Sequence, residues 1–347
     1  MFSYKSNSLL SEEMSLPLVS IVTPSYNQGH YIKETIESVL TQDYPNIEFW
    51  VIDGGSTDET ISILQEYEQD SRFHWISEPD NGQSNAINKG WKLCKGDIIT
   101  WLNSDDTYLP GAIQTQVNAL LSHPDYGAVY GDGIFIDEKG KEIYRCHASS
   151  YSLLELLRIT IPLQPTVFIR RNIVNEVGLI NENYKYSMDS EYWVRVAKVT
   201  NFWHEQKFIA TYRLHDNSKT IANYSGFYND WLSIADNFFE EPTASNIANL
   251  DRFKQQVYGG IYGRIATIEA EKGLVREAIK YLCRSIYLVG FRARSFKTVM
   301  LLIERLFPFE FMSKFVEFWT VLRTQFQINH EEHKEHKKHE EHKERRV

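Results

Sequence analysis

The sequence predicts an α/β fold with a mostly parallel central sheet flanked by helices, followed by a C-terminal helical extension. Three observations carry this prediction. Short apolar runs alternate with helical patterns over the first third of the chain, polar or acidic residues follow each run, and the region after about residue 222 is almost all helical in pattern. Alternation of strands and helices is typical of a parallel sheet with helices packed on its faces.

The expected elements follow one another with short loops between them. Residues 1–16 are expected to form a flexible arm. The expected strands are 18–23, 47–52, 73–76, 97–102, 128–130, 134–136, 142–144, 167–169 and 208–212, and the expected helices are 31–40, 57–67, 85–94 and 190–198.

The composition is that of a globular protein and restricts the classes of function. The chain has 347 residues and a net charge of −9, so no nucleic-acid partner is expected, because such binding depends on neutralising phosphates. Its three cysteines are far apart and form no CxxC pair, which favours a reducing cytosol over a disulfide framework. The N-terminus lacks the layout of a signal peptide, and no apolar run of about 18 residues predicts a membrane-spanning helix. A cytoplasmic location is therefore expected.

Polar loops follow the first four expected strands. They contain Thr23–Asn27, Asp53, Asp80–Gln83 and Asp105–Asp106. Because ligands bind beyond the carboxyl ends of strands in open α/β sheets, these loops are expected to meet at one site. The adjacent carboxylates at positions 105 and 106 repel each other, and a divalent cation would relieve that repulsion.

Four blocks of the sequence, in the right order, resemble family 2 glycosyltransferases with the GT-A fold. They are VSIVTPSYNQGHYIKETIESVLTQDYPNIEFWVIDGGSTDET, EPDNGQSNAINKGWKLCKGDIITWLNSDD, YSMDSEYWVRV and YRLHDNSKT, and they lie within residues 17–220. The resemblance implies an inverting enzyme that moves a sugar from a UDP- or dTDP-type nucleotide-sugar to a hydroxyl of a saccharide or lipid-linked saccharide acceptor. It further implies a place in bacterial cell-surface polysaccharide synthesis.

The resemblance assigns the acidic doublet to the family's DxD-type element, which holds Mn²⁺ or Mg²⁺. Asp106 is expected to bind the metal, and Asp105 to contact the ribose or the metal shell. Asn103 stands where many relatives carry a further acid. Arg213 is expected near the diphosphate, and His215 either contacts the metal or phosphate or has a structural role. The alternative is a helix N-terminus with acidic residues in its first turn.

The resemblance also indicates how the nucleotide is recognised. Tyr26 is expected to stack on the base, and Asp53 to accept a hydrogen bond from a ring N–H of uracil or thymine. Taken alone, the loops after the second and third strands are equally compatible with simple turns. The residues expected to bind the nucleotide-sugar are Thr23, Pro24, Ser25, Tyr26, Asp53, Asp80, Gln83 and Asp105.

The reaction needs a base that accepts the proton of the acceptor hydroxyl. MDSEYWVRV aligns with the family's E-D-x-x-x-W motif, which places Asp189 at the catalytic position and Met188 at that of the usual Glu. Glu191 is the substitute candidate. Capping of the following helix by Asp189 is compatible with catalysis. Gln164, before the strand at 167–169, is expected to face the acceptor.

The remaining chain is divided into a catalytic domain at 17–222, a helical accessory region at 223–329 and a charged, His-rich, disordered tail at 330–347. Residues 259–288 resemble a tetratricopeptide helix pair. Residues 284–323 combine aromatic and basic side chains, which suits either a helix on an anionic membrane surface or helices packed on protein. In the tail, metal binding by histidines is the alternative to a solvated segment.

Two rival functions remain open. A nucleotidyltransferase on a related sheet would need a basic, Gly-rich loop after the first strand, and TPSYNQGHY contains no Lys or Arg. A catalytically silent, nucleotide-sugar-binding scaffold is left open by Asn103 and Met188, where the sequence departs from the family pattern.

Overall fold

The computed structural model describes residues 16–215 and 224–306. The chain divides into two compact units, residues 1–253 and 254–347. Residues 1–15 of the arm expected at 1–16, residues 307–329 of the accessory region and the tail at 330–347 lie outside the described residues.

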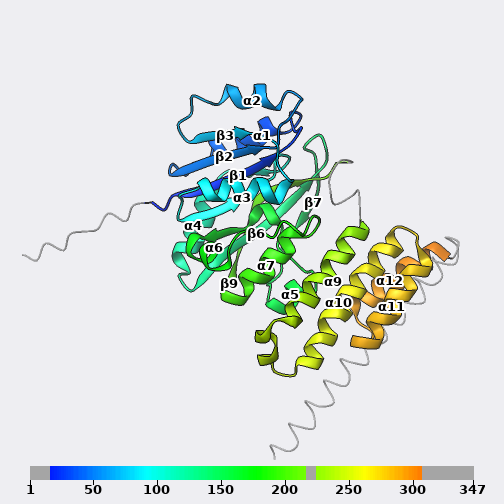
Figure 1. The fold of residues 1–347 in the computed structure, drawn as a ribbon. Coiled ribbons are helices and arrows are strands. Elements are labelled where there is room, and N and C mark those ends of the chain that lie inside the picture. Colours follow the sequence, from blue (N-terminus) through cyan, green and yellow to red (C-terminus); the bar gives the residue numbers. More distant parts are fainter. Residues whose placement is uncertain (1–15, 216–223, 307–347) are drawn as a thin grey trace, which may run out of the picture. The chain divides into compact units, whose positions relative to one another are not determined.

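A mixed nine-stranded sheet forms the centre of the first unit (Figure 1). The strands are β1 (Val19–Ser25), β2 (Ile47–Asp53), β3 (Phe73–Ser77), β4 (Ile98–Trp101), β5 (Thr107–Tyr108), β6 (Tyr126–Ile136), β7 (Glu142–Cys146), β8 (Phe168–Arg170) and β9 (Asn201–Arg213). Their order is β3-β2-β1-β4-β8-β6-β9-β5, with β7 paired to β6. Strands β1 to β4 pair in parallel, as do β6 and β9, while β5, β7 and β8 run antiparallel to their neighbours. The expected α/β class is therefore confirmed.

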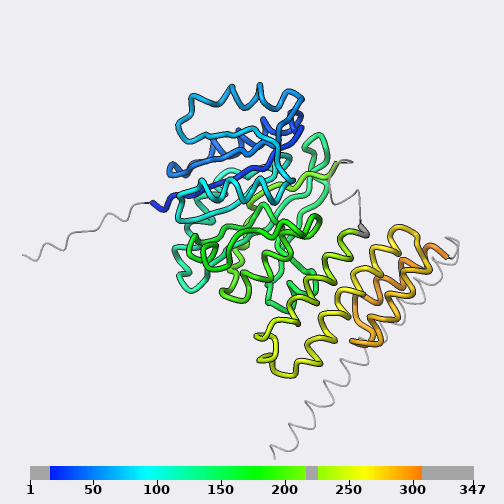
Figure 2. Tube along the Cα trace, viewed as in Figure 1, coloured from blue at the N-terminus to red at the C-terminus, as the bar shows by residue number. Residues whose placement is uncertain are grey.

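Helices of the first unit flank this sheet. They are α1 (Ile32–Leu40), α2 (Thr60–Glu66), α3 (Gln83–Leu93), α4 (Ala112–Ser122), α5 (Leu153–Leu157), α6 (Arg171–Val177), α7 (Met188–Val199) and α9 (Tyr224–Glu240), with 3₁₀ turns at Gln164–Thr166 and Pro242–Asn246. Figure 2 shows the chain running through β1 to β4, in blue to cyan, before it enters the green strands of the other half of the sheet.

The two faces of the parallel strands are covered by different helices. Ile32 and Ile36 lie on one side of α1 and pack in a fully buried core with Ile21 of β1. On the opposite face, α3 approaches so closely that a Cβ on Gly90 would lie 2.5 Å from a methyl carbon of Val22. Because both faces are covered, β1 is buried along its whole length, which explains its continuous apolar run.

Strand β6 is longer than the sequence pattern indicated. The expected strands at 128–130 and 134–136 are one continuous strand, because residues 131–133 stay paired with β9 through two register shifts. The sequence pattern did not indicate this pairing, because Gly131, Asp132 and Gly133 are residues that favour turns.

The acidic doublet is followed by strand β5 rather than by a helix, and α4 begins only at Ala112. The alternative of acidic helix caps is therefore excluded.

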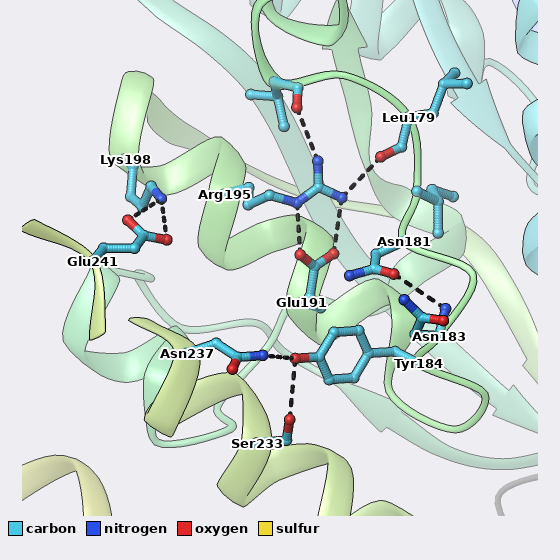
Figure 3. A network of polar contacts seen from close by, with 12 residues as sticks. Leu179, Asn181, Asn183, Tyr184, Glu191, Arg195, Lys198, Ser233, Asn237 and Glu241 are labelled. Carbon is cyan, nitrogen blue, oxygen red and sulfur yellow. Dashed lines mark hydrogen bonds and ion pairs between the residues drawn. The ribbon is translucent and has the colours of Figure 1, made fainter. Parts of the chain in front are cut away.

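Helix α9 packs within the first unit, so that this unit extends past the boundary expected at residue 222. Asp230 of α9 accepts hydrogen bonds from the backbone N–H groups of Tyr186 and Ser187, both at 3.0 Å. Just after α9, the Glu241 carboxylate pairs with Lys198 of α7 at 2.6 Å (Figure 3). These contacts connect α9 and the residue after it to both the loop before α7 and the last turn of α7.

The second unit contains most of α10 (Leu250–Glu271), together with α11 (Val275–Val289) and α12 (Ala293–Leu306). A helix pair is thus present where the sequence indicated one, with Gly273 at φ +80° in its turn. Small and apolar side chains fill its core, and Thr267 and Thr298 share a buried hydrogen bond of 2.8 Å. This favours packing on protein for residues 284–306. In the described part of the chain, no helix combines the length and apolar character needed to cross a bilayer.

Candidate active site

The acidic doublet lies in a turn between β4 and β5, at the carboxyl end of the parallel strands. The hydroxyl of Thr35, from α1, donates to the carbonyls of Ser104 and Asp106 at 2.9 and 2.8 Å and fixes the turn. Strand β5 then pairs with the distant β9. The end of β9 therefore lies against Asp105 and Asp106, and this pairing brings the later sequence block to the doublet.

The two carboxylates occupy different environments. Asp106 is 1% exposed, and its oxygens accept hydrogen bonds from the backbone N–H of Arg213 at 2.9 Å and the amide of Asn103 at 3.1 Å. Burial raises the pKa of the Asp106 carboxyl well above its usual range, and the charge of Asp105 raises it further. The Asp105 side chain is 22% exposed and lies 3.0 Å from Nε2 of His215. Asp105 is therefore the more exposed carboxylate of the doublet, and the expected binding of a metal by Asp106 stays a prediction.

Buried contacts of Arg213 fix the position of the acidic doublet. It is 2% exposed, its Nε donates to the carbonyl of Asp105 at 2.9 Å, and its guanidinium pairs with Glu34. The same guanidinium lies 4.9 Å from the ring centroid of Tyr31, and the His215 ring lies 4.9 Å from that ring. These contacts occupy Arg213 within the protein, so the geometry does not support the expected role at the diphosphate.

A relay of amides connects the acidic turn to two neighbouring segments. Gln83, at the start of α3, donates to Oδ1 of Asn103 at 2.7 Å, and Asn103 donates to Oε1 of Gln164 at 3.1 Å. Gln164 in turn donates to the carbonyl of Trp101 at 2.7 Å. Asn103 thus both accepts and donates, which an ionised carboxylate at this position could not do. This explains the amide at position 103, and it leaves Gln164 in a supporting role rather than facing an acceptor.

Asp189 lies in the first turn of α7, and its carboxylate accepts a hydrogen bond from the N–H of Ser190 at 2.7 Å. Beside it, Met188 is 6% exposed and its sulfur lies 2.8 Å from the hydroxyl of Ser84, at the start of α3. The neighbouring Gln83 reaches the acidic turn through the amide relay. Met188 is therefore a packing residue that draws the start of α7, and Asp189 with it, toward the edge of the sheet that carries the doublet.

Asp53 is fully buried at the end of β2. Its carboxylate accepts hydrogen bonds from the N–H groups of Gly55 and Ser56 at 3.0 and 2.8 Å and from the Ser77 hydroxyl at 2.7 Å. The Ser56 hydroxyl is a further donor. Both oxygens accept hydrogen bonds from the protein, and these bonds organise the loop after β2. The expected role of Asp53 in reading the base stays a prediction.

That loop positions the exposed ring of Tyr26. The N–H of Asn27, at φ +51°, donates to the hydroxyl of Ser56 at 2.7 Å, and the N–H of Thr57 returns a bond to the Asn27 amide oxygen at 2.8 Å. Tyr26 is 60% exposed beside this anchor. A rigid, exposed aromatic ring is suited to stacking on a base.

Two buried hydroxyls lie at the end of β1 next to Tyr26. Among the residues that the structure describes, Thr23 Oγ1 and Ser25 Oγ have no hydrogen-bond partner. Such groups are rare in folded proteins and each requires an explanation. A ligand with polar atoms would supply the missing partners.

Comparisons with known proteins identify the family of the chain. The model of glycosyl transferase family 2 matches residues 20–178. The Bacillus subtilis (strain 168) protein TuaG, named provisionally as a teichuronic acid biosynthesis glycosyltransferase, is 30% identical over 62% of this chain and 86% of its own length. The chain belongs to glycosyl transferase family 2. An uncharacterized glycosyltransferase of Rickettsia felis is 32% identical over 65% of this chain, and the chain spans 39% of that relative.

Solved structures of similar fold include two glycosyltransferase complexes. The Staphylococcus aureus TarS fragment 1–349 with UDP-GlcNAc has a TM-score of 0.60 at 16% identity, covering 83% of this chain and 89% of that chain. The mannosyltransferase PcManGT of Pyrobaculum calidifontis, with GDP-Man and Mn²⁺, has a TM-score of 0.56 at 16% identity, covering 85% and 82%. These similarities confirm the expected GT-A architecture for this family 2 member.

Glu191, the substitute candidate for the base, is committed to an ion pair. Its two oxygens accept from Nε and a terminal nitrogen of Arg195 at 2.7 and 2.8 Å, and the Glu191 side chain is 12% exposed. Arg195 also donates to the carbonyls of Val177 and Leu179, both at 2.9 Å (Figure 3). This network fastens α7 to the loop before it and leaves Asp189 as the base candidate of this family 2 chain.

Replacing Glu191 with Gln is expected to lower the free energy of unfolding by about 1–3 kcal/mol, because a charge-assisted pair with Arg195 is lost. Urea unfolding monitored by tryptophan fluorescence measures this loss. The rate of sugar transfer by the folded variant is expected to stay close to that of the wild type. A stable variant with strongly reduced transfer would instead identify Glu191 as the base.

Three residues at the start of α1 and its N-cap support the site, although the sequence pattern did not predict this role. Tyr31, Glu34 and Thr35 contact either the acidic turn or its Arg213 support. They fall within the expected helix at 31–40, but helical periodicity identifies only the apolar side of a helix. These three residues lie on one face of a helix that begins directly after the β1 loop. This shared position was the signal in the sequence that could have predicted their role.

The described residues contain no cluster of three or more His, Cys, Asp or Glu side chains arranged to hold a metal ion. At the doublet, Nε2 of His215 lies 3.0 Å from Oδ2 of Asp105. The Asp105 carboxylate fits a cation whose other ligands are phosphate oxygens and water, as is usual for Mg²⁺, whereas the His215 imidazole is a ligand more typical of transition metals. The residues present therefore fit a donor-bound cation rather than a closed protein site.

Proposed function

We propose that the protein is an inverting glycosyltransferase that transfers a sugar from a UDP- or dTDP-type nucleotide-sugar to a hydroxyl of a saccharide or lipid-linked saccharide. One observation carries this proposal. The contacts from Met188 to Ser84 and from Gln83 to Asn103 bring the helix start with Asp189 to the turn with Asp105. These contacts support the proposal that Asp189, as the base, and Asp105, as an acid near the diphosphate, act at one edge of the sheet.

In this proposal Asp105 and His215 would hold Mn²⁺ or Mg²⁺ together with the donor diphosphate. When bound, such a cation offsets the negative charge that develops on the leaving group. The Mn²⁺ in the PcManGT complex supports a metal-dependent reaction on this fold. Asp106 and Arg213 contribute by fixing the conformation of the acidic turn. Asn103 contributes by donating hydrogen bonds to Asp106 and to Gln164 of the amide relay.

Asp189 is the proposed general base. It accepts the proton of the acceptor hydroxyl while the acceptor oxygen forms a bond to the anomeric carbon, and the bond from that carbon to the phosphate oxygen breaks. Attack from the side opposite the leaving group inverts the configuration, and no covalent enzyme intermediate is needed. A carboxylate oriented by the first turn of α7 is suited to this role, because such proton transfer requires fixed geometry.

The acceptor class is proposed from the relatives. The provisional name of TuaG concerns teichuronic acid biosynthesis, and a chondroitin synthase of Escherichia coli is 31% identical over 59% of this chain. Both names concern polysaccharide assembly, which supports a saccharide or lipid-linked saccharide acceptor. The expected association of residues 284–323 with the inner face of a membrane is not part of this proposal, because side chains of residues 286–302 pack in the core of the second unit and residues 307–323 lie outside the described residues.

The silent-scaffold alternative loses its two sequence arguments. Asn103 is explained by its amide relay and Met188 by its contact with Ser84, so neither departure requires a lost activity. The nucleotidyltransferase alternative still lacks a basic loop after β1.

The test is a donor screen with the purified full chain. UDP-, dTDP- and GDP-sugars are incubated with Mn²⁺ or Mg²⁺, and release of the nucleoside diphosphate is measured with and without saccharide acceptors. We expect metal-dependent release from a UDP- or dTDP-sugar that is stimulated by an acceptor. Failure of every donor to bind, measured by calorimetry on the folded protein, would contradict the proposal.

A further inference from the structure

We infer that the second unit carries a binding site for an anionic saccharide, in a cavity between α10 and α11. The choice of a saccharide rests on the proposed function, because the acceptor or the product of that reaction would be the ligand. The cavity and every contact that supports it lie within the described part of the second unit, residues 254–306.

The two helices that form the cavity are held together at close range. A Cβ on Gly259 of α10 would lie 2.6 Å from a methyl carbon of Val289 of α11. The Ser285 hydroxyl donates to the carbonyl of Gly259 at 2.7 Å, and this contact is buried (Figure 1). Because this packing fixes the walls, the cavity is formed before a ligand arrives, as is usual for small-molecule sites.

The cavity has the size and the lining of a ligand site. Its volume is about 400 Å³, and ligand sites usually have about 300–1,000 Å³. Three aromatic rings, one cation and one aliphatic side chain form the described lining, namely Tyr258, Tyr262, Arg284, Tyr287 and Leu288. Tyr287 is 89% exposed, so its ring is accessible to a ligand at the surface.

Aromatic rings, rather than a carboxylate, position the guanidinium of Arg284. Its central carbon lies 5.6 Å from the ring centroid of Tyr262 and 5.8 Å from that of Tyr281. These two rings stack on each other with their centroids 6.1 Å apart. No ion pair in the described part of this unit includes Arg284. An Arg side chain placed in this way presents its N–H groups for bidentate binding of a carboxylate or a phosphate.

The charge of the surrounding helices favours an anionic ligand. Residues 275–306, which span α11 and α12, contain seven Lys or Arg residues and two Asp or Glu residues. The chain as a whole carries a net charge of −9. This basic stretch therefore attracts an anion, whereas the chain as a whole repels it.

The lining favours a saccharide over a protein helix or a lipid tail. The faces of a sugar ring carry C–H groups that pack on aromatic rings, and its hydroxyl groups can exchange hydrogen bonds with tyrosine hydroxyls. A protein helix in a groove and an acyl chain instead bury mainly aliphatic surface. Leu288 is the one aliphatic side chain in the described lining. The acid group of the saccharide, either a carboxylate or a phosphate, would pair with Arg284.

The experiment measures calorimetric affinities of the full chain for two anionic probes and their neutral counterparts. One probe is a tetrasaccharide with glucuronic acid at alternate positions, compared with its methyl ester. The other is a mannose oligosaccharide phosphorylated at O6, compared with the unphosphorylated form. We expect wild type to bind at least one anionic probe about tenfold more tightly than its neutral counterpart. The preferred probe identifies the acid group as a carboxylate or a phosphate.

Variants locate the binding in this cavity. Arg284→Gln is expected to weaken binding of the preferred probe by about tenfold or more, because a hydrogen-bonded charge pair is lost. Tyr262→Leu is expected to weaken it by about three- to tenfold through loss of stacking. The matched control is Lys297→Gln, which removes the same charge from an exposed position of α12 outside the lining and is expected to leave the affinity unchanged.

Thermal unfolding verifies that each variant is folded. If Tyr262→Leu does not fold, Tyr287→Ala takes its place, because a ring that is 89% exposed contributes little to the core. The same loss of affinity is expected for this variant.

The outcomes separate the saccharide site from the proposed function. Binding that is unchanged in Arg284→Gln, or failure of folded wild type to bind either anionic probe, refutes the site. Sugar transfer without saccharide binding in the cavity refutes the site and leaves the proposed function intact. Saccharide binding through Arg284 by a chain that binds no donor supports the site and contradicts the proposed function.

Two other occupants of the cavity are tested in parallel. Flotation with vesicles of phosphatidylglycerol tests a membrane, and sedimentation velocity tests a second copy of the chain. If either association occurs and is lost in Tyr287→Ala, while no saccharide probe binds, the cavity serves that partner and the saccharide site is refuted.

Discussion

Replacing Asp189 with Asn is expected to lower the rate constant of sugar transfer by about 10²–10⁴-fold, the usual contribution of a positioned general base. The amide keeps the shape of the side chain and its hydrogen bond from Ser190 but cannot accept the proton of the acceptor. The measurement is single-turnover transfer to a saccharide acceptor at saturating donor. Donor affinity, measured by calorimetry, is expected to stay near that of the wild type, because Asp189 acts on the acceptor side.

The matched control for Asp189→Asn is Glu191→Gln, two positions along the same helix. The first variant is expected to lose transfer and keep stability, whereas the second loses stability and keeps transfer. A reversal of this pattern would move the base to Glu191. Retained transfer in both variants would show that the base lies outside α7.

Replacing Asp105 with Asn is expected to weaken binding of Mn²⁺ to the UDP-bound protein by at least about tenfold, because loss of groups at a metal site costs about 10–100-fold in affinity. Electron paramagnetic resonance of free Mn²⁺ measures this change without relying on turnover. Transfer is expected to fall with it, since the charge of the departing diphosphate is then less well offset.

Asp106→Asn is the comparison that separates the two carboxylates. An amide at position 106 would place an N–H against the amide nitrogen of Asn103, so the free energy of unfolding is expected to fall by about 1–3 kcal/mol. Its Mn²⁺ affinity is expected to remain near the wild-type value. If Asp106→Asn loses Mn²⁺ and Asp105→Asn keeps it, the metal belongs to Asp106, as the sequence analysis expected.

The first half of the fold was predictable from the sequence because its signals are local. Each of β1 to β4 is an apolar run that ends in polar residues, and α1 and α3 carry their own helical periodicity. The convergence of four strand ends followed from the rule for parallel sheets. The C-terminal helix pair was also predictable, because its helical pattern is local in the sequence.

The roles of individual site residues were less predictable, because they depend on partners far away in the chain. Asp53 is enclosed partly by Ser77, 24 positions away, and Asp106 by Arg213, 107 positions away. No local pattern distinguishes a carboxylate surrounded by such donors from one that faces a ligand. For the same reason the pairing of β6 with β9 overrode the turn-forming residues in the middle of β6.

The pairing of β5 with β9 has a consequence for how the protein matures during synthesis. The nucleotide half of the site is encoded before residue 102, whereas the strand that secures the acidic turn ends at Arg213. A nascent chain therefore contains the loops after β1 to β3 long before the acidic turn acquires its final environment. Contacts of such large sequence separation form slowly, so assembly of the reaction centre is expected to be the late event in folding of this unit.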